Sequence, residues 1–371
     1  MKPGVGRMTR DEYVKLKKRK EEKKRLKQER LAKRAKAEGE REAEEDGGSS
    51  ATTSETRTLS IAVPGSILEN AQSAELRTYL AGQIARAACI FEVDEVIVYD
   101  DLPDTDAGRR VGVDEQVYGV RTVRRCCAQL ARVLQYLECP QYLRRSFFPV
   151  HKDLEYAGLL NPLDAPHHLR QADDFAYREG IVTNHAGKAG HSYVNVGLLK
   201  EVSVKKELAP GLRVTVKLLP DKSSKKLRGE VVAPSEPRAA TGVYWGYTVR
   251  IAQALSDVFC RAPYPGGYDV TLGTSDRGVS VHGLAEGSLS QHRHALVVFG
   301  GLQGLEAALE SDDKLTVDDP ALLFDHYLNT CPGQGSRTIR TEEAVLVSLA
   351  VLRPKFSLCE QRDNFKHTAK N

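Results

Sequence analysis

Apolar and polar residues follow two different periods along this chain, and each period predicts a different architecture. Leu59–Val63 and Asp94–Tyr99 are short apolar runs that predict buried strands. Ala74–Phe91 and Cys126–Leu137 carry apolar residues at helical spacing and predict amphipathic helices. Residues 101–120 are polar and irregular, and they predict an exposed loop. The region therefore begins as a βαβα pattern.

From Phe175 the pattern changes to short alternating strands separated by turns rich in Gly, Pro, Lys and Asp. The predicted strands are Gly180–Thr183, Tyr193–Val204, Arg213–Leu219 and Leu227–Ala233. Four or five short strands so close together predict a small closed barrel. The βα pattern then resumes at Tyr247.

Three segments near the C-terminal end each join a short apolar strand to a loop of small residues. The first segment, residues 268–278, is a short strand that ends in the small and polar residues Thr274–Gly278. Ala295–Phe299 is the second strand; Gly300 and Gly301 close it, and a helix begins near Gly304. Loops at the carboxyl ends of strands form the ligand crevice of open α/β sheets. The order of these segments therefore predicts a binding site.

The third of these loops, Asn329–Ser336, is the richest in small residues. Gly333 and Gly335 allow a positive φ and a close approach of the main chain to a ligand. Thr341 is expected to cap a buried apolar helix that opens with two glutamates at its positive end. Taken alone, the loop is equally compatible with a Gly-rich turn before a core helix. With the other two loops, it predicts a cofactor site bound through backbone atoms.

Two common nucleotide sites do not fit this loop. A phosphate-binding P-loop requires Gly-x4-Gly-Lys-Ser/Thr, and no lysine is present between Asn329 and Ser336. A dinucleotide site requires Gly-x-Gly-x-x-Gly at the start of a βαβ unit, whereas Gly333 and Gly335 are followed by Thr338.

Composition narrows the class of protein further. The chain has 371 residues, and none of its apolar runs reaches the roughly 18 residues of a membrane span. It contains 7 cysteines, an odd number without a C-x-x-C pair, so neither a disulfide framework nor a zinc site is predicted. Asp164, His167 and His168 lack a fourth ligand, so their segment is expected to pack or to line the substrate side rather than bind metal.

The charge is concentrated in one stretch. Lys15–Lys36 holds a large excess of Lys and Arg over Glu, while the net charge of the whole chain is only +4. An acidic stretch and a Gly/Ser-rich linker follow it. This tail is expected to be solvated and partly helical. It is expected either to bind nucleic acid through phosphates and act as a nuclear-import signal, or to have no further role.

The three C-terminal segments together resemble the SPOUT-class methyltransferases. The run Gly335–Ala344 is similar to the corresponding motif of bacterial rRNA uridine-N3 methyltransferases of that class. After residue 56, nearly the whole chain is similar to the animal SPOUT-domain-containing methyltransferases, a family also described as centromere proteins. The runs that carry this similarity, besides the C-terminal motifs, are Leu59–Asn70, Glu75–Ala88, Gln135–Leu143, Ala157–His168 and Tyr244–Arg250.

The resemblance implies an α/β fold tied in a deep trefoil knot around S-adenosylmethionine, with an OB-like barrel inserted. The domains it implies are a tail at 1–55, SPOUT parts at 56–172 and 241–371, and the barrel at 173–240. The loops and the resemblance assign a set of residues to the cofactor. They are Thr274, Arg277, Gly300, Gly301, Asn329, Thr330, Pro332, Gly333, Gln334, Gly335 and Ile339. Gly301 is expected to let the ribose approach.

The expected chemistry is methyl transfer to N3 of a uridine in large-subunit rRNA. Arg340 and Arg337 are predicted to stabilise the base anion, the alternative being that they bridge the loop to carboxylates. Arg277 could serve the cofactor or the substrate. Cys331 could act as a nucleophile, but transfer in this class is understood as direct. The resemblance also implies a homodimer whose partner subunit completes the site.

The barrel is the expected second RNA contact. Its basic residues either bind RNA or keep a small barrel soluble; they are Lys200, Lys205, Lys206, Arg213, Lys217, Lys222, Lys225, Lys226 and Arg228. Tyr177 and Tyr193 could stack bases or be buried.

Two other functions stay open. One is a non-catalytic nucleic-acid or spindle and kinetochore scaffold that retains a cofactor pocket, and the other is methylation of another RNA or atom. The expected location is the nucleus or nucleolus, with the mitotic spindle and kinetochore as further sites.

Overall fold

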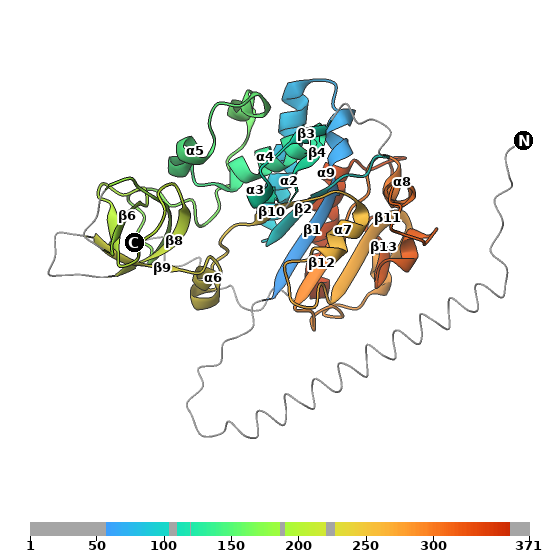
Figure 1. Cartoon of the computed structure of the whole chain (residues 1–371). Coiled ribbons are helices and arrows are strands. Elements are labelled where there is room, and N and C mark those ends of the chain that lie inside the picture. Colours follow the sequence, from blue (N-terminus) through green and yellow to red (C-terminus); the bar gives the residue numbers. More distant parts are fainter. Residues whose placement is uncertain (1–56, 104–109, 119, 186–189, 220–226, 357–371) are drawn as a thin grey trace, which may run out of the picture. The chain divides into compact units, whose positions relative to one another are not determined.

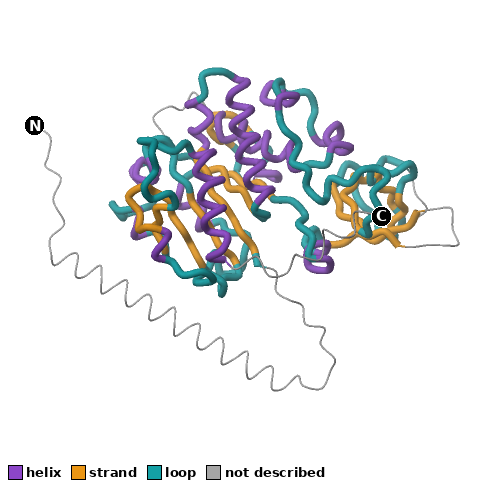
Figure 2. The backbone as a smooth tube through the Cα atoms, turned by 180° about the vertical axis from the view of Figure 1, so that it is seen from behind, coloured by secondary structure: helices purple, strands orange, loops and turns teal. Residues whose placement is uncertain are grey.

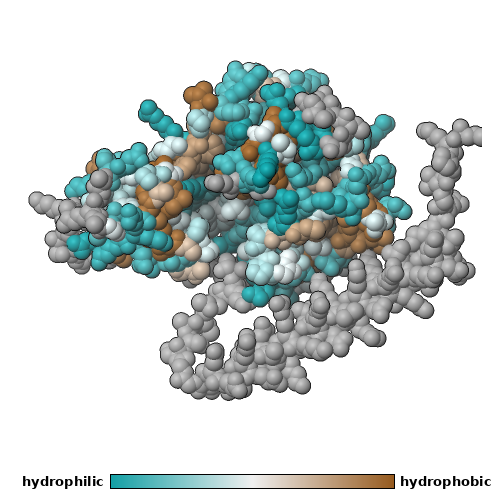
Figure 3. Space-filling model, in the orientation of Figure 1, coloured by the Kyte–Doolittle hydropathy of each residue, from teal (hydrophilic) through white to brown (hydrophobic). Residues whose placement is uncertain are grey.

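The structure, a computed structural model, describes residues 57–103, 110–118, 120–185, 190–219 and 227–356 (Figure 1). All of these residues belong to one compact unit. The basic tail of residues 1–55 lies outside them. Within the described part, every helix is too short or too polar to cross a membrane. The face shown in Figure 3 is largely hydrophilic, with hydrophobic residues in separate patches.

A six-stranded parallel sheet, in the order β10-β2-β1-β12-β11-β13, lies at the centre of the unit. Its strands are β1 (Thr58–Pro64), β2 (Glu95–Tyr99), β10 (Thr248–Ala252), β11 (Val270–Ser280), β12 (His294–Val298) and β13 (His326–Asn329). Parallel sheets are covered on both faces, so their strands are almost continuously apolar. That rule explains why the apolar runs at β1, β2 and β12 could be recognised from sequence, and these three predictions are confirmed to within one residue at each end.

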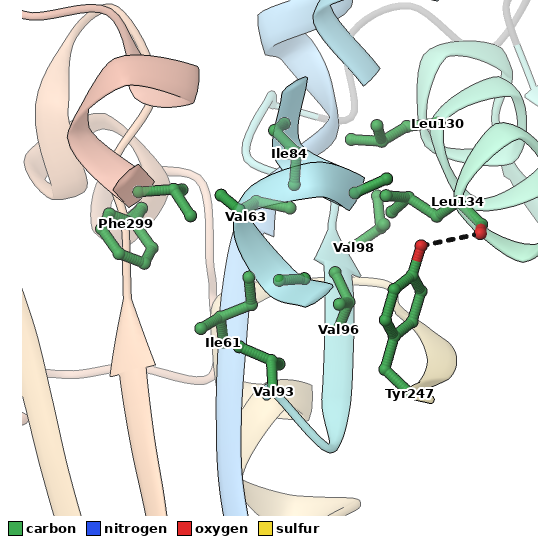
Figure 4. Packing of buried hydrophobic residues seen from close by; sticks show 14 of the residues in the cluster. Ile61, Val63, Ile84, Val93, Val96, Val98, Leu130, Leu134, Tyr247 and Phe299 are labelled. Atoms are coloured by element: carbon green, nitrogen blue, oxygen red, sulfur yellow. Dashed lines mark hydrogen bonds between the residues drawn. The ribbon is translucent and has the colours of Figure 1, made fainter. Parts of the chain in front are cut away.

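Helices cover both faces of the sheet, because successive residues of a strand point to opposite sides. One face carries α2 (Ala74–Ile90), α4 (Arg125–Glu138) and α9 (Thr341–Phe356), and the other carries α7 (Leu255–Cys260) and α8 (Gly304–Glu310). Figure 2 shows helices lying across the first face. Ile61 and Val63 of β1 are buried there beside Ile84 of α2, as seen in Figure 4, whereas Ala62 is buried on the other face.

Residues 101–120 do not form the exposed loop that was predicted, so far as they are described. β3 (Arg110–Gly112) pairs antiparallel with β4 (Thr122–Arg124), and α3 (Glu115–Tyr118) lies between them in the chain. Tyr118 and Val120 are buried in the main core. The polar composition concealed these few buried side chains.

The remaining helical segments are short. They are η1 (Gly65–Asn70), α5 (Gln141–Phe147), η3 (Lys152–Leu154), η4 (Ala157–Leu159), α6 (Glu236–Thr241), η5 (Val281–Gly283) and η6 (Pro320–Leu322).

A closed five-stranded barrel follows, in the order β5-β6-β7-β9-β8. Its strands are β5 (Tyr177–Val182), β6 (Ser192–Asn195), β7 (Val202–Val204), β8 (Arg213–Leu219) and β9 (Leu227–Val232). Valines such as Val194 and Val216 fill its core. The barrel was predicted, but the single strand expected at 193–204 is wrong. The chain turns near Gly197, at φ +76°, and β6 and β7 pair antiparallel.

Buried charges join the barrel to the α/β part. Arg213 of β8 donates to both carboxylate oxygens of Glu138, at the end of α4, over 2.8 and 3.0 Å. It also donates to Glu179 of β5, which accepts a further hydrogen bond from Trp245 Nε1 at 2.8 Å. Burial alone would raise the pKa of Glu138, but the charge of Arg213 and the hydrogen bonds from Arg213 and His167 hold it well below its usual range.

We expect replacement of Arg213 with Met to lower the free energy of unfolding by about 3 kcal/mol, because it strands a buried carboxylate. This is the lower end of the usual cost, since 33% of the Arg213 side chain is exposed. Urea unfolding at neutral pH measures the loss. Lys205→Met removes an exposed cation of the same barrel and should cost less than about 0.5 kcal/mol.

The pH dependence of the free energy of unfolding tests the same ion pair between Arg213 and Glu138. Because the pKa of Glu138 is lower in the folded chain than in the unfolded chain, its contribution is complete above about pH 5 and is lost on acidification. The stability difference between wild type and Arg213→Met should therefore shrink steadily as the pH falls from about 5 to about 2. A difference that stays constant over this range would contradict the assignment.

Candidate functional site

A cavity of about 470 Å³ opens where β11, β12 and β13 end. Carboxyl ends of parallel strands meet at one edge of a sheet, so the loops that leave them share a crevice. The wall is completed by η1, by Leu80 of α2 and by the first turns of α9. The volume lies within the roughly 300–1,000 Å³ of small-molecule sites.

The structure brings most of the predicted site residues to this wall. They are Thr274, Gly300, Gly301, Asn329, Thr330, Gln334, Arg337, Ile339 and Arg340. Four others are not among the wall residues, namely Arg277, Pro332, Gly333 and Gly335. Their roles as cofactor ligands stay predictions.

Segment Thr274–Gly278 was expected to be a loop after the strand, and here the prediction is wrong. The strand β11 continues to Ser280, and both Thr274 and Val279 pair with Leu328 of β13. The residues between them form a bulge that exposes Ser275 and Asp276 to the cavity. Bulges re-aim side chains in this way next to functional sites.

The loop after β12 is held by close backbone packing. A side chain on Gly300 would collide with the backbone of Gly304 and Leu305, at 2.7–2.9 Å. Gly304 itself has a φ of +78°, a conformation that favours glycine. The Thr341 hydroxyl donates a hydrogen bond of 2.9 Å to the Gly300 carbonyl. The start of α9 is thereby fastened to the loop.

Gly301 has a structural role that the sequence did not indicate. A Cβ at this position would lie 2.9 Å from the carboxylate of Asp101. Asp101 follows β2 and accepts hydrogen bonds from the hydroxyl and backbone N–H of Ser66, at 2.5 and 3.2 Å. Burial raises the pKa of Asp101, partly offset by these hydrogen bonds. The absent side chain of Gly301 thus leaves room for this acid.

The loop after β13 is shaped by its own polar groups. Asn329 accepts a hydrogen bond from the backbone of Cys331 at 3.0 Å and donates to the carbonyl of Asp276 at 2.9 Å. Gln334 donates to the carbonyl of Ser336 at 3.0 Å. The small residues therefore hold the loop open while the side chain of Asn329 ties it to the bulge of β11.

The cap of α9 differs from the prediction. Thr341 is the first helical residue rather than the cap. The carboxylate of Glu343 reaches back to accept from the backbone N–H of Arg340 at 3.0 Å. This is the second half of a capping box, and it leaves the Thr341 hydroxyl free for Gly300. The helix is also only half buried, because Leu346 and Ala350 are exposed.

The arginines near the cavity fall into two groups. Arg277 is exposed and pairs with Glu306 of α8 at 3.1 Å. Arg337 and Arg340 are exposed wall residues, and within the described part of the chain neither guanidinium makes a hydrogen bond or ion pair. Both of these side chains are thus available to an anionic or electron-rich ligand.

Several wall residues were missed by sequence reasoning. They are Ile67, Asn70, Ala71, Leu80, Phe299, Thr341, Glu342, Ala344 and Ser348. The run after β1 carried a usable signal, because β1 neighbours β12 and its carboxyl end reaches the same edge. The residues of α9 carried none, because periodicity does not show which helical turn faces a cavity.

Two other candidates lie away from this cavity. His167 is fully buried, and His167 and His168 both donate to the carbonyl of Glu138, at 2.9 and 2.7 Å. The described residues include no group of three potential metal ligands. Tyr177 is buried against Trp245, so it packs in the core rather than offering a base platform.

Comparisons with known proteins support these observations. A family model described as "Putative RNA methyltransferase" matches residues 58–352. A protein of Drosophila melanogaster named 28S rRNA (uridine-N(3))-methyltransferase is 60% identical over 325 residues, covering 85% of this chain and 67% of its own length. The Homo sapiens protein of the same name is 58% identical over 300 residues, with coverage of 80% and 78%. The family resemblance drawn from the motifs is confirmed.

We expect Thr341→Val to lower the free energy of unfolding by about 1–2 kcal/mol, because it leaves the Gly300 carbonyl without its donor. Urea unfolding measures this loss. Thr338→Val is the matched control, since Thr338 is exposed on the same wall and its hydroxyl makes no hydrogen bond to a described residue. Equal losses of stability in the two variants would show that the hydrogen bond from Thr341 to Gly300 does not stabilise the fold.

Proposed function

The chain belongs to this family of RNA methyltransferases, and we propose that it transfers the methyl group of S-adenosylmethionine to N3 of a uridine in large-subunit rRNA. The observation that carries the proposal is the cavity at the ends of β11, β12 and β13, in a chain 58–60% identical to proteins named for this reaction. The substrate and the modified atom are transferred from those names.

The cavity fits a methyl donor in size and in chemistry. Gly300, Gly301 and Thr330 line the wall and leave space for a flat ligand, and Asn329 and Gln334 are the amide side chains of the wall. Such groups would read adenine and ribose by hydrogen bonds. When bound, S-adenosylmethionine supplies an electrophilic methyl group. The protein's part is then to position the base and to ease the loss of its proton.

Arg337 and Arg340 are the groups that we assign to the substrate. Loss of the N3 proton leaves negative charge on the uracil oxygens, and a wall guanidinium without a partner among the described residues would stabilise that charge. The target base must be unpaired or flipped out of its stack to enter. Arg277, Pro332, Gly333 and Gly335 are proposed as outer contacts of the donor loop.

We also propose that the C-terminal segment is threaded as a deep trefoil knot. The support is the family resemblance together with the strand order, in which β11 lies between β12 and β13. The domain limits proposed with it are a tail at 1–55, methyltransferase parts at 56–172 and 241–371, and an OB-like insertion at 173–240.

The barrel and the tail are proposed as RNA contacts. Lys200, Lys205, Lys206 and Arg228 are exposed on the barrel, whereas Arg213 is committed to Glu138 and Glu179. Lys222, Lys225 and Lys226 lie outside the described residues. The basic tail further supports a nuclear or nucleolar location, and the resemblance to centromere proteins supports an additional spindle or kinetochore role.

A homodimer is the proposed assembly. Leu76 and Tyr79 of α2 and Leu346 of α9 are exposed to 53%, 46% and 45%. A groove of about 450 Å³ runs between these two helices and residues 160–161. An uncovered apolar helix face of this kind marks an interaction site. The same helices border the cavity, so a second copy seated there would stand close to the substrate.

Nucleoside mass spectrometry tests the proposed reaction. The substrate is large-subunit rRNA from cells that lack this protein. We expect purified protein with S-adenosylmethionine to form N3-methyluridine in that rRNA. Arg340→Ala should lower the rate about 100-fold while donor affinity in calorimetry is retained. Arg261→Ala is the control. Arg261 is an exposed arginine at the end of α7 that is not part of the cavity wall, so this variant should keep the wild-type rate.

Three results would contradict the proposal at different levels: the activity, the modified base and the role of Arg340. If the donor binds and no nucleoside changes, the chain acts as a nucleic-acid or spindle scaffold instead. If a different nucleoside gains the methyl group, the reaction class stands and the base is wrong. If Arg340→Ala keeps the wild-type rate, that arginine has no part in the reaction.

We expect Leu346→Glu to convert a dimer into a monomer, because it places a charge on the apolar face of α9. Light scattering after size-exclusion chromatography measures the mass. Leu199→Glu, at a barrel leucine that is 90% exposed, should leave the dimer intact. A wild-type protein that elutes as a monomer would overturn the proposed assembly.

A further inference from the structure

One acidic residue of the cavity wall has no hydrogen-bond or ion-pair partner among the described residues. Glu342 is the second residue of α9, and only 8% of it is exposed. It lines the cavity and also the groove between α2 and α9, so its side chain lies between the two. Throughout the described residues, its carboxylate takes part in no hydrogen bond and no ion pair.

The neighbouring residue, Glu343, has the structural role that a glutamate at the start of a helix usually has. Glu343 is exposed, and its carboxylate caps the helix by accepting from the backbone N–H of Arg340. The helix end is therefore already capped without Glu342. The carboxylate oxygens of Glu342 are not among the fully buried unpaired atoms of the described residues, so they stay open to the cavity or the groove, where a ligand group can meet them. An ionised carboxylate only accepts, so it can take a hydrogen bond or a proton from such a group.

The other charged groups around Glu342 are few. The cavity wall adds Arg337, Arg340 and Asp276, and the groove adds Arg86 and Glu343. Cys331 and Tyr79 are the further titratable groups of these walls. Asp276 is exposed and accepts from the Ser275 hydroxyl at 3.3 Å. Glu342 is therefore the one carboxylate of the described cavity wall that is both buried and unpaired.

We propose that Glu342 is the general base that removes the N3 proton of the target uridine, an inference that rests on the proposed function. A carboxylate oxygen of Glu342 takes the proton from N3. The N3 electron pair then forms a bond to the transferred methyl carbon, whose bond to sulfur breaks, leaving its electron pair on sulfur as a neutral thioether. The proton on Glu342 later passes to water. Arg337 and Arg340 stabilise the uracil oxygens while N3 carries the charge.

The test compares wild type with Glu342→Gln, which keeps the shape and removes the basic oxygen. We expect the rate of N3-methyluridine formation at neutral pH to fall about 100-fold or more. The rate of wild type should fall on acidification as the base is protonated, whereas that of Glu342→Gln should lack this acid limb and rise with hydroxide. Calorimetric affinity for S-adenosylhomocysteine and the urea midpoint should stay at wild-type values.

A more acidic substrate separates a base from a structural residue. In RNA that carries 5-fluorouridine, the fluorine withdraws electrons and the N3 proton leaves more easily. The deficit of Glu342→Gln should therefore become several-fold smaller on this RNA. Glu343→Gln is the matched control, because it removes the same charge one residue along. Its rate should keep the acid limb of wild type.

Each contrary outcome has a defined meaning. Loss of S-adenosylhomocysteine binding by Glu342→Gln would make Glu342 a donor ligand and overturn the proposal. An acid limb unchanged in Glu342→Gln, or an equal deficit on both RNAs, would also overturn it. If wild type itself forms no N3-methyluridine, the proposed function fails together with this role. If wild type is active, failure of the Glu342 result leaves the function standing.

Discussion

The parallel pairing of β11 with both β12 and β13 is the constraint on which the cavity depends. It brings three chain segments to one sheet edge, although each is separated from the next by a helix or a long connection. The hydrogen bond from Thr341 to Gly300 then closes the set, because it fixes the helix that follows the last loop against the loop that follows the middle strand. The wall residues that follow β1 are placed by a third restraint, the parallel pairing of β1 with β12.

Structural features that depend on local sequence patterns could be predicted, whereas those that depend on distant parts of the chain could not. Buried parallel strands such as β2 and β12 are recognisable because both faces demand apolar residues. The bulge of β11 was not recognisable, because its pairing depends on β13, some fifty residues away. The turn at Gly197 was hidden for a similar reason, since strand periodicity runs through it. The burial of Glu342 depends on α2 and the loops, and local sequence carries no sign of it.

Charged residues perform separate tasks in this molecule. Arg213 forms ion pairs with Glu138 and Glu179, and Arg277 forms an ion pair with Glu306. Arg337 and Arg340 make no such contact with the described residues, so their charge remains directed at the cavity. Composition alone treats all four alike. The distinction between a structural and a functional arginine comes from the partners that the fold supplies.

The ionic joint at Arg213 bears on how the two parts of the fold hold together. One guanidinium meets both Glu138 at the end of α4 and Glu179 of β5. Separating the barrel from α4 would leave at least one of these buried carboxylates without its cation, which is strongly unfavourable. The barrel and the sheet are therefore expected to lose their structure in a single cooperative transition.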